Sequence, residues 1–293
     1  MGGLDEPLIG GAPKGASSMA ASAVVLFKAV VGTGIFALPP AIRASGWLLG
    51  SGLVVLMASL SAYTMGLVAA SVQELRSRGF VGAHGPIEFQ DMTAAAFPRL
   101  NGPILVSCLL ANLGAIVGFF EFTTSNLLAF LPGAERWHAT LCITLFVAPL
   151  SLLRSTSHPL FRMTMLFGNA AVALAAGSVL YFGLSTHRAA PLSSLSAADP
   201  SGFGLTFGVC IFMFAAHMEI VSIEQDMRDK SQVFRLILLT FAVLLLLHLA
   251  FGVLVYAAFG EATGRVWWHG AWQEETILQN GKYGKGSRCC HRC

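Results

Sequence analysis

The chain has 293 residues, of which 55% are hydrophobic and only 11% are charged, with a formal net charge of +3. Since a soluble domain carries about 25% charged residues, this composition excludes an ordinary soluble globular protein. The apolar residues fall in long continuous runs and not in segments of about ten residues with alternating polarity. This pattern predicts an all-α polytopic membrane protein.

Seven apolar segments are predicted to cross the bilayer, because each has about the 20 residues that a hydrocarbon core near 30 Å requires. They cover residues 20–42, 47–72, 103–130, 137–153, 160–184, 202–223 and 233–259. The division into domains follows from them. Residues 1–19 are predicted to be a disordered N-terminal tail, 20–262 a transmembrane domain, and 263–293 an atypical C-terminal tail.

The first segment contains an interruption of its helical pattern. Gly32 and Gly34 lie on either side of Thr33, and each glycine costs about 1 kcal/mol of helix propensity relative to alanine. A glycine-interrupted apolar helix indicates a broken helix, whose freed backbone N–H groups can hold a substrate carboxylate at the bilayer midplane. Alternatively, the glycines only let a neighbouring helix approach closely.

The second and third segments are joined by a longer polar loop, 73–100, in which residues 87–97 are expected to form a short interfacial helix. Polar residues interrupt the third segment at 121–126. Two roles fit Glu121 at its membrane depth. It carries a proton, or it hydrogen-bonds across helices near the outer half of the bilayer.

Ionisable residues within the spans are candidates for function. Lys28 lies about 12 Å from the start of the first segment, at a rise of 1.5 Å per residue, and Glu219 lies at a similar depth in the sixth. We expect these opposite charges to approach each other, or to share a polar cavity, on the cytoplasmic side. Otherwise Lys28 extends to the interface, and Glu219 belongs with Glu224 to the charged turn that follows the sixth segment, E-Q-D-M-R-D-K at 224–230. His217 is either a substrate or proton site or a hydrogen-bonding core residue.

The distribution of lysine and arginine predicts the orientation. With a cytoplasmic N-terminus, the inner flanks hold nine such residues and the outer loops three. The inner residues are Lys14, Arg76, Arg78, Arg99, Arg154, Arg162, Arg228, Lys230 and Arg235, and the outer ones are Arg43, Arg136 and Arg188.

The C-terminal tail has no spanning run. Cys289, Cys290, His291 and Cys293 are metal-binding residue types, but their spacing fits no usual zinc signature. A reading-frame or splicing change accounts for the composition of the tail at least as well as metal binding does. The chain also has no phosphate-binding loop and no nucleophile elbow. We therefore expect no enzyme activity, no cofactor, no resident metal and no nucleic-acid partner.

Four motifs resemble the amino acid/auxin permease family, especially its vacuolar and proton-coupled branches. The first is V-G-T-G-I-F-A-L-P-P-A-I-R-A-S-G, residues 31–46. The second places Gly114, Phe119, Phe122 and Asn126-Leu127 as in the pattern G-x4-Y-x2-F-x3-N-L. The third is P-L-S-L-L-R at 149–154. The fourth, F-A-A-H-M-E-I-V-S-I-E at 214–224, is similar to F-x-C-H-x-E-x-x-P-I-Y.

This resemblance implies a LeuT-type inverted-repeat fold with the first repeat complete (helices 1–5) and the second partial (helices 6 and 7). Helices 1 and 6 would both be broken, although the sixth segment has no central glycine. Backbone groups of the first break would hold the carboxylate, Phe119 would form a pocket wall, and the second break would face the first. The implied substrate site consists of Val31, Gly32, Thr33, Gly34, Phe119, Phe214, Ala215, Ala216 and His217. The ion-coupling or buried charges are Lys28, Glu121 and Glu219.

The implied function is secondary active transport (symport) of small neutral amino acids, with a proton favoured over sodium as coupling ion, in a vacuolar, lysosomal or plasma membrane. Three positions depart from the family pattern. Phe119 replaces a tyrosine, Ala215 stands where the proton-coupled branch has an acidic residue, and Ser222 replaces a proline. Family members have about eleven spans, so we expect the chain to be truncated after the seventh helix. The alternatives are a seven-span ligand-binding sensor and a non-transporting fragment.

Overall fold

The computed structural model describes residues 17–32, 34–80, 87–131, 133–151, 159–186 and 189–263. These residues are almost entirely helical, which confirms the all-α fold class. The longer helices are α1 (Met19–Val30), α2 (Gly34–Ser45), α3 (Trp47–Ser77), α4 (Phe89–Ala96), α5 (Asn101–Phe130), α6 (Arg136–Ser151), α7 (Pro159–Thr186), α8 (Phe203–Met213), α9 (Glu219–Asp226) and α10 (Val233–Phe259). Short 3-10 turns are η1 (Leu192–Ser194), η2 (Pro200–Gly202), η3 (Lys230–Gln232) and η4 (Gly260–Ala262).

Four helical stretches of the described chain are long and apolar enough to cross a membrane, and a fifth span results if the bent pair α1 and α2 counts as one. The four are Trp47–Ser77, Asn101–Leu128, Leu166–Ser185 and Lys230–Phe259. This criterion counts only long single helices, so the division into seven spans stays a prediction. The sixth segment is divided between α8 and α9, and α6 has only 16 residues, so neither provides a single long apolar helix.

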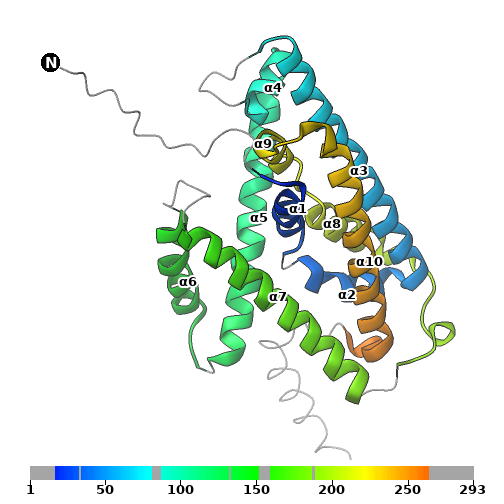
Figure 1. Ribbon diagram of the computed structural model, residues 1–293. Coiled ribbons are helices and arrows are strands. Elements are labelled where there is room, and N and C mark those ends of the chain that lie inside the picture. The colour runs from blue at the N-terminus through cyan, green and yellow to red at the C-terminus, as the bar shows by residue number, and fades with distance from the viewer. Residues whose placement is uncertain are drawn as a thin grey trace, which may run out of the picture.

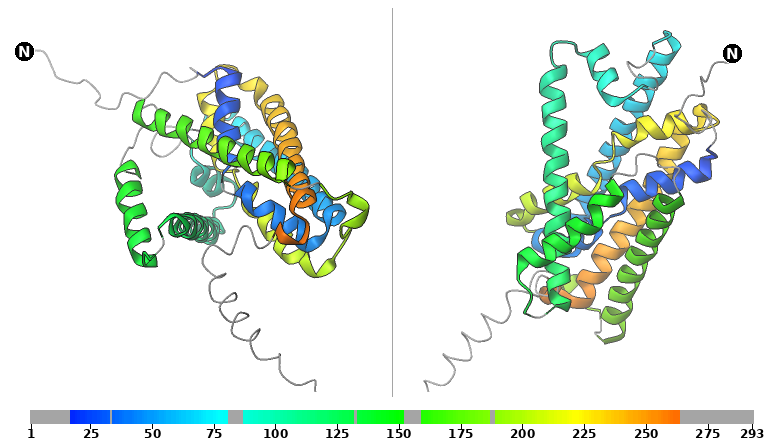
Figure 2. Two further views of the ribbon diagram at one scale, coloured as in Figure 1. Left: turned by 90° about the horizontal axis from the view of Figure 1, so that it is seen from below. Right: turned by 90° about the vertical axis from the view of Figure 1, so that its left-hand side faces the viewer.

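The helices form a bundle with a peripheral group beside it (Figures 1 and 2). In the bundle, α10 packs along α3, α2 and α1, while α8 packs on α2 and α3 and α9 packs on α1 and α3. Outside it, α5 and α6 pack against each other and α7 lies along α10. The most apolar window of α3 is 39% buried within the protein and that of α10 is 44% buried. The corresponding shares are 0% for α5 and 6% for α7. The core therefore lies within the bundle.

The connection before α8 closes one end of the bundle. The first backbone N–H groups of α3, which have no partner within the helix, donate to this connection. Trp47 N–H bonds Ser196 O at 3.0 Å and Leu48 N–H bonds Ala197 O at 2.9 Å. Gly46 just before α3 has φ +84°, a conformation that favours glycine, and a Cβ there would lie 2.6 Å from the backbone of Ala197. The turn at Gly46 therefore lets the connection lie directly against α3.

Candidate functional site

The first membrane helix is interrupted at its glycine pair. The α1 helix ends at Val30, Val31 adopts an extended conformation (φ −79°, ψ 102°), and α2 begins at Gly34 with its axis turned by 53°. Val31 N–H still donates to Phe27 O at 2.7 Å. Thr33 lies outside the described residues. The interruption thus occurs where the glycines predicted it.

The sixth apolar segment is also interrupted, between Met213 at the end of α8 and Glu219 at the start of α9. Two side chains of α3 bond polar groups of this interruption. Ser61 Oγ donates to the Phe214 carbonyl at 2.8 Å, and Thr64 Oγ1 lies 2.8 Å from His217 Nε2. The second interruption is therefore held by polar groups from a neighbouring helix, which explains how it forms without glycine.

The two interruptions lie next to each other. A Cβ on Gly34 would be 3.5 Å from Phe212 Cδ1 and 3.6 Å from Met213 Cα, at the end of α8. From α5, the Phe119 ring packs on Phe212 with ring centroids 5.4 Å apart. A Cβ on Gly32 would lie 4.0 Å from the same Phe119 ring. Residues from three separate apolar segments thus meet at one place.

The remaining candidates around the second interruption differ in exposure. Phe214 and Ala216 are buried in the main hydrophobic core, at 2% and 3% exposure, and His217 is partly buried. Val31 packs against the same core, whereas the Ala215 side chain is exposed. Of these candidates, then, Ala215 is the one directed away from the core.

Two grooves open elsewhere on the bundle. One of about 490 Å³ lies between α3 and α10, lined by Ala62, Gly66 and Phe241 among others, and the second lies between α3 and α4. Neither is lined by residues of the two interruptions.

The charged candidates agree only in part with their expected positions. Among the ion pairs of the described chain, none joins Lys28 to Glu219, so the expected direct pair is not formed. Instead, a Cβ on Gly168 of α7 would lie 3.5 Å from Lys28 Nζ, and Glu219 is exposed at the start of α9. Glu121 pairs across helices with Arg136 of α6, which agrees with the second of its two expected roles.

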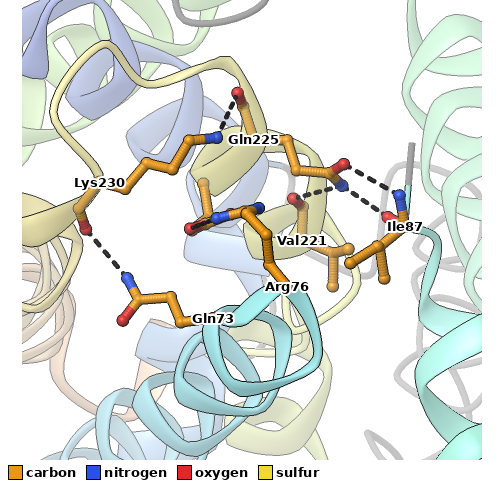
Figure 3. Close-up of polar contacts among 7 residues, drawn as sticks. Gln73, Arg76, Ile87, Val221, Gln225 and Lys230 are labelled. Atoms are coloured by element: carbon orange, nitrogen blue, oxygen red, sulfur yellow. Dashed lines mark hydrogen bonds and ion pairs between the residues drawn. The ribbon is translucent and has the colours of Figure 1, made fainter. Parts of the chain in front are cut away.

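A partly buried polar cluster that the sequence did not predict joins α3 to α9 (Figure 3). The Glu224 side chain is 0% exposed, and Arg76 donates two hydrogen bonds to it, at 2.7 and 2.6 Å. Gln225 exchanges two hydrogen bonds with the backbone of Ile87, just before α4. Gln73 donates to the carbonyl of Lys230 at 3.0 Å. We call Gln73, Arg76, Ile87, Glu224, Gln225 and Lys230 the α3–α9 polar cluster.

The sequence placed Glu224 and Gln225 in a charged turn, but both belong to α9. Their spacing gave little signal, because the run E-Q-D-M-R-D-K reads as a solvated turn when its partners on α3 are unknown. The same end of α9 also contacts the segment before α1. Ser17 N–H donates to Asp226 O at 3.0 Å, and Arg228 N–H donates to Ser17 O at 2.9 Å.

The family model for the transmembrane amino acid transporter protein matches residues 15–279. The chain is 24% identical over 255 residues to vacuolar amino acid transporter 3 of Schizosaccharomyces pombe, covering 84% of this chain and 37% of that protein. It is 26% identical over 287 residues to amino acid transporter AVT3C of Arabidopsis thaliana, covering 88% of this chain and 63% of that protein.

The chain therefore spans between about a third and two thirds of the length of these relatives. No solved structure matches it. The family model covers most of the chain, and the relatives are transporters and not enzymes. The chain is a multi-pass membrane protein that belongs to the transmembrane amino acid transporter protein family.

Proposed function

We propose that this chain is a secondary active transporter of small neutral amino acids, driven by a proton gradient, which binds its substrate between the two interrupted helices. The observation that carries the proposal is the contact between the two interrupted helices, where Gly34 lies against Phe212 and Met213. The family membership supports amino acids as the substrate class.

The chemistry of the two interruptions suits a zwitterion. The first N–H groups of α2 carry the partial positive charge of a helix N-terminus, which favours a carboxylate. The last carbonyl groups of α1 and α8 carry partial negative charge, which favours an ammonium group. In this proposal Val31, Gly32, Thr33 and Gly34 bind the carboxylate through their backbone. The side of the site formed by Phe214, Ala215, Ala216 and His217 faces the ammonium group and the side chain.

Phe119 closes the site from α5. Its ring touches Phe212 and faces Gly32, so it shields the main chain of the first interruption from the bilayer. An aromatic wall and a narrow space between Gly34 and Met213 favour a small apolar side chain on the substrate. This reasoning supports small neutral amino acids as the substrate class.

The mechanism that we propose is a rocking movement of the bundle against α5 and α6, as in a LeuT-type fold. Two sets of contacts support this division into moving parts. The α3–α9 polar cluster joins two bundle helices, and Ser17 joins the start of α1 to the end of α9. These contacts would make the bundle helices move together.

We also propose a vacuolar membrane location with the N-terminus in the cytoplasm. The location rests on the vacuolar transporter of Schizosaccharomyces pombe among the relatives. The orientation rests on the excess of lysine and arginine on one side. With this orientation the α3–α9 polar cluster lies at the cytoplasmic end of the bundle.

Replacing Gly34 by leucine tests the binding site. The added side chain would fill the space beside Phe212 and Met213, so we expect the affinity for a radiolabelled neutral amino acid to fall at least about tenfold, or 1.4 kcal/mol. Gly52→Leu is the matched control, because a Cβ at Gly52 on α3 meets no atom within 4 Å. Binding to purified protein in detergent measures both variants.

Uptake into proteoliposomes with and without a proton gradient tests the transport activity itself. The proposal predicts that an inward proton gradient accumulates the amino acid in the wild-type protein. Equal affinity in the Gly34→Leu and wild-type proteins would contradict the binding site. Binding without any uptake would contradict transport and favour a ligand-binding sensor.

A further inference from the structure

The most unusual side chain in the bundle is that of His248, in the middle of α10. Its side chain is 0% exposed, although it lies in a membrane-spanning helix. Its Nδ1 atom lies 2.6 Å from the Leu244 carbonyl oxygen, and its Nε2 atom is buried with no hydrogen-bond partner in the described chain. A buried polar atom without a partner is rare in native proteins and requires an explanation.

The contact with Leu244 determines which nitrogen of the His248 ring carries the proton. A carbonyl oxygen only accepts hydrogen bonds, so Nδ1 carries the proton that it donates. In the neutral imidazole, Nε2 then has a free lone pair and no proton. The lone pair of Nε2 is therefore the position at which this buried ring can take up one proton.

His248 lies level with both interruptions. Its ring is 5.5 Å from the ring of Phe214, the first residue of the second interruption. The helices α2 and α10 run side by side in the same direction, since Phe251 contacts Phe36 and, beyond α10, Glu261 pairs with Arg43. One turn before Phe251, His248 consequently lies beside the start of α2, where the first interruption ends.

The other histidine near the site differs from His248 in this respect. His217 Nε2 lies 2.8 Å from Thr64 Oγ1. That hydroxyl also lies 2.8 Å from the Leu60 carbonyl, to which it donates its own proton. His217 Nε2 thus has a hydrogen-bond partner on α3. His217 therefore lacks the free buried Nε2 of His248.

The charged and titratable groups on the elements packed around α10 lie mostly at helix ends. Two of them lie near the interruptions: Lys28 at the end of α1, whose Nζ lies beside Gly168 of α7, and Glu219 at the start of α9, which is exposed. Tyr63 on α3 is 65% exposed. The others are Arg43 on α2, Glu74, Arg76 and Arg78 on α3, Arg162 and Tyr181 on α7, Glu224 and Asp226 on α9, Lys230 in η3, Glu261 in η4, and Arg235 and Tyr256 on α10 itself.

We propose that Nε2 of His248 is the binding site of the coupling proton. This inference rests on the proposed transport function. A hydronium ion from the cytoplasmic or lumenal side gives its proton to Nε2, where an N–H bond forms as an O–H bond of the donor breaks. The imidazolium ring keeps its hydrogen bond to Leu244 and lies 5.5 Å from the centroid of the Phe214 ring, within the distance of a cation–π contact. Release of the proton to water on the other side restores the neutral ring.

Protonation would change the charge beside both interruptions. The new positive charge lies near the carbonyl ends of α1 and α8, which favour a cation. It also lies beside the start of α2, where the substrate carboxylate is proposed to bind. Proton binding and amino-acid binding therefore support each other, which is the coupling that a symporter requires.

His248→Asn and His248→Gln test the proposal in the full chain, reconstituted in proteoliposomes. Asparagine places an amide N–H near the position of Nδ1 and can keep the bond to Leu244, but it cannot take up a proton. We expect both variants to lose gradient-driven accumulation while exchange of labelled for unlabelled amino acid at equal pH continues. His138→Asn is the matched control, because His138 is exposed on α6 and stacks on Trp137, and it should accumulate the amino acid as the wild type does.

A second measurement does not depend on transport. In protein labelled with ¹⁵N-histidine, we expect one imidazole signal that titrates with a single proton, shifts when the amino acid is added, and disappears in His248→Asn. Gradient-driven accumulation in both His248 variants, or a His248 signal that does not titrate, would overturn the proposal. Absence of uptake by the wild type would instead overturn the transport function on which the proposal rests, even where the His248 signal titrates.

Discussion

Replacing Glu224 by glutamine is expected to destabilise the folded protein by about 3 kcal/mol. This is the lower end of the cost of breaking a buried ion pair, because the Glu224 side chain is fully buried while the side chain of Arg76 is 34% exposed. The substitution leaves Arg76 without its counter-charge and loosens the attachment of α9 to α3. Thermal unfolding of the purified protein in detergent measures the effect.

The control for this prediction is Glu74→Gln, which removes a carboxylate from α3, the helix that carries Arg76. Glu74 pairs with Arg78 at 2.8 Å, but their side chains are 60% and 73% exposed, so we expect a loss of no more than about 0.5 kcal/mol. Replacing both partners of the pair, as Arg76→Met with Glu224→Leu, should recover most of the stability. Similar unfolding temperatures for Glu224→Gln and Glu74→Gln would show that the buried pair contributes little.

Gly202→Ala is also expected to destabilise the folded protein, by about 3 kcal/mol or more, because the added methyl group would be packed too closely against main-chain atoms. A Cβ on Gly202 would lie 2.1 Å from the Ala44 carbonyl oxygen and 2.5 Å from Ser45 N. Backbone atoms cannot move aside as the end of a side chain can. The start of α8 would have to separate from α2, which would also strain the bond from Thr206 Oγ1 to the Ala41 carbonyl.

Gly204→Ala is the matched control two residues further along. A Cβ at Gly204 meets no atom within 4 Å, and alanine has a helix propensity up to about 1 kcal/mol better than glycine. The control should be neutral or slightly stabilising, so the two variants are expected to differ in sign. Unfolding temperatures that fall equally in both variants would mean that the close contact of Gly202 with α2 is wrong.

The first interruption could be predicted from the sequence because its cause is local. Gly32 and Gly34 lower helix propensity at the centre of an apolar segment, and the helix does break between Val30 and Gly34. The second interruption has no such signal in F-M-F-A-A-H. Ser61 and Thr64 of α3 hold its polar groups, and this tertiary cause is invisible in the local sequence. Only the family resemblance implied it.

The contacts of the charged residues could not be predicted from the local sequence either. Lys28 and Glu219 were matched by depth and sign, but depth along two helices does not determine which way a side chain faces. Glu219 is exposed, while Glu224, five residues later, is fully buried against Arg76. Five residues along a helix of 3.6 residues per turn change the facing direction by about 140°. The relevant face depends on packing that the sequence alone did not provide.

Hydrogen–deuterium exchange tests the central claim most directly, namely that two adjacent helix interruptions bind one amino acid through their main chain. In the reconstituted protein without ligand, the amides of residues 31–36 and 214–220 should exchange faster than those in the middle of α3. Addition of a small neutral amino acid should protect both segments together and leave α5 beyond Phe119 unchanged. Slow exchange at both segments without ligand, or fast exchange that the amino acid does not alter, would contradict the account.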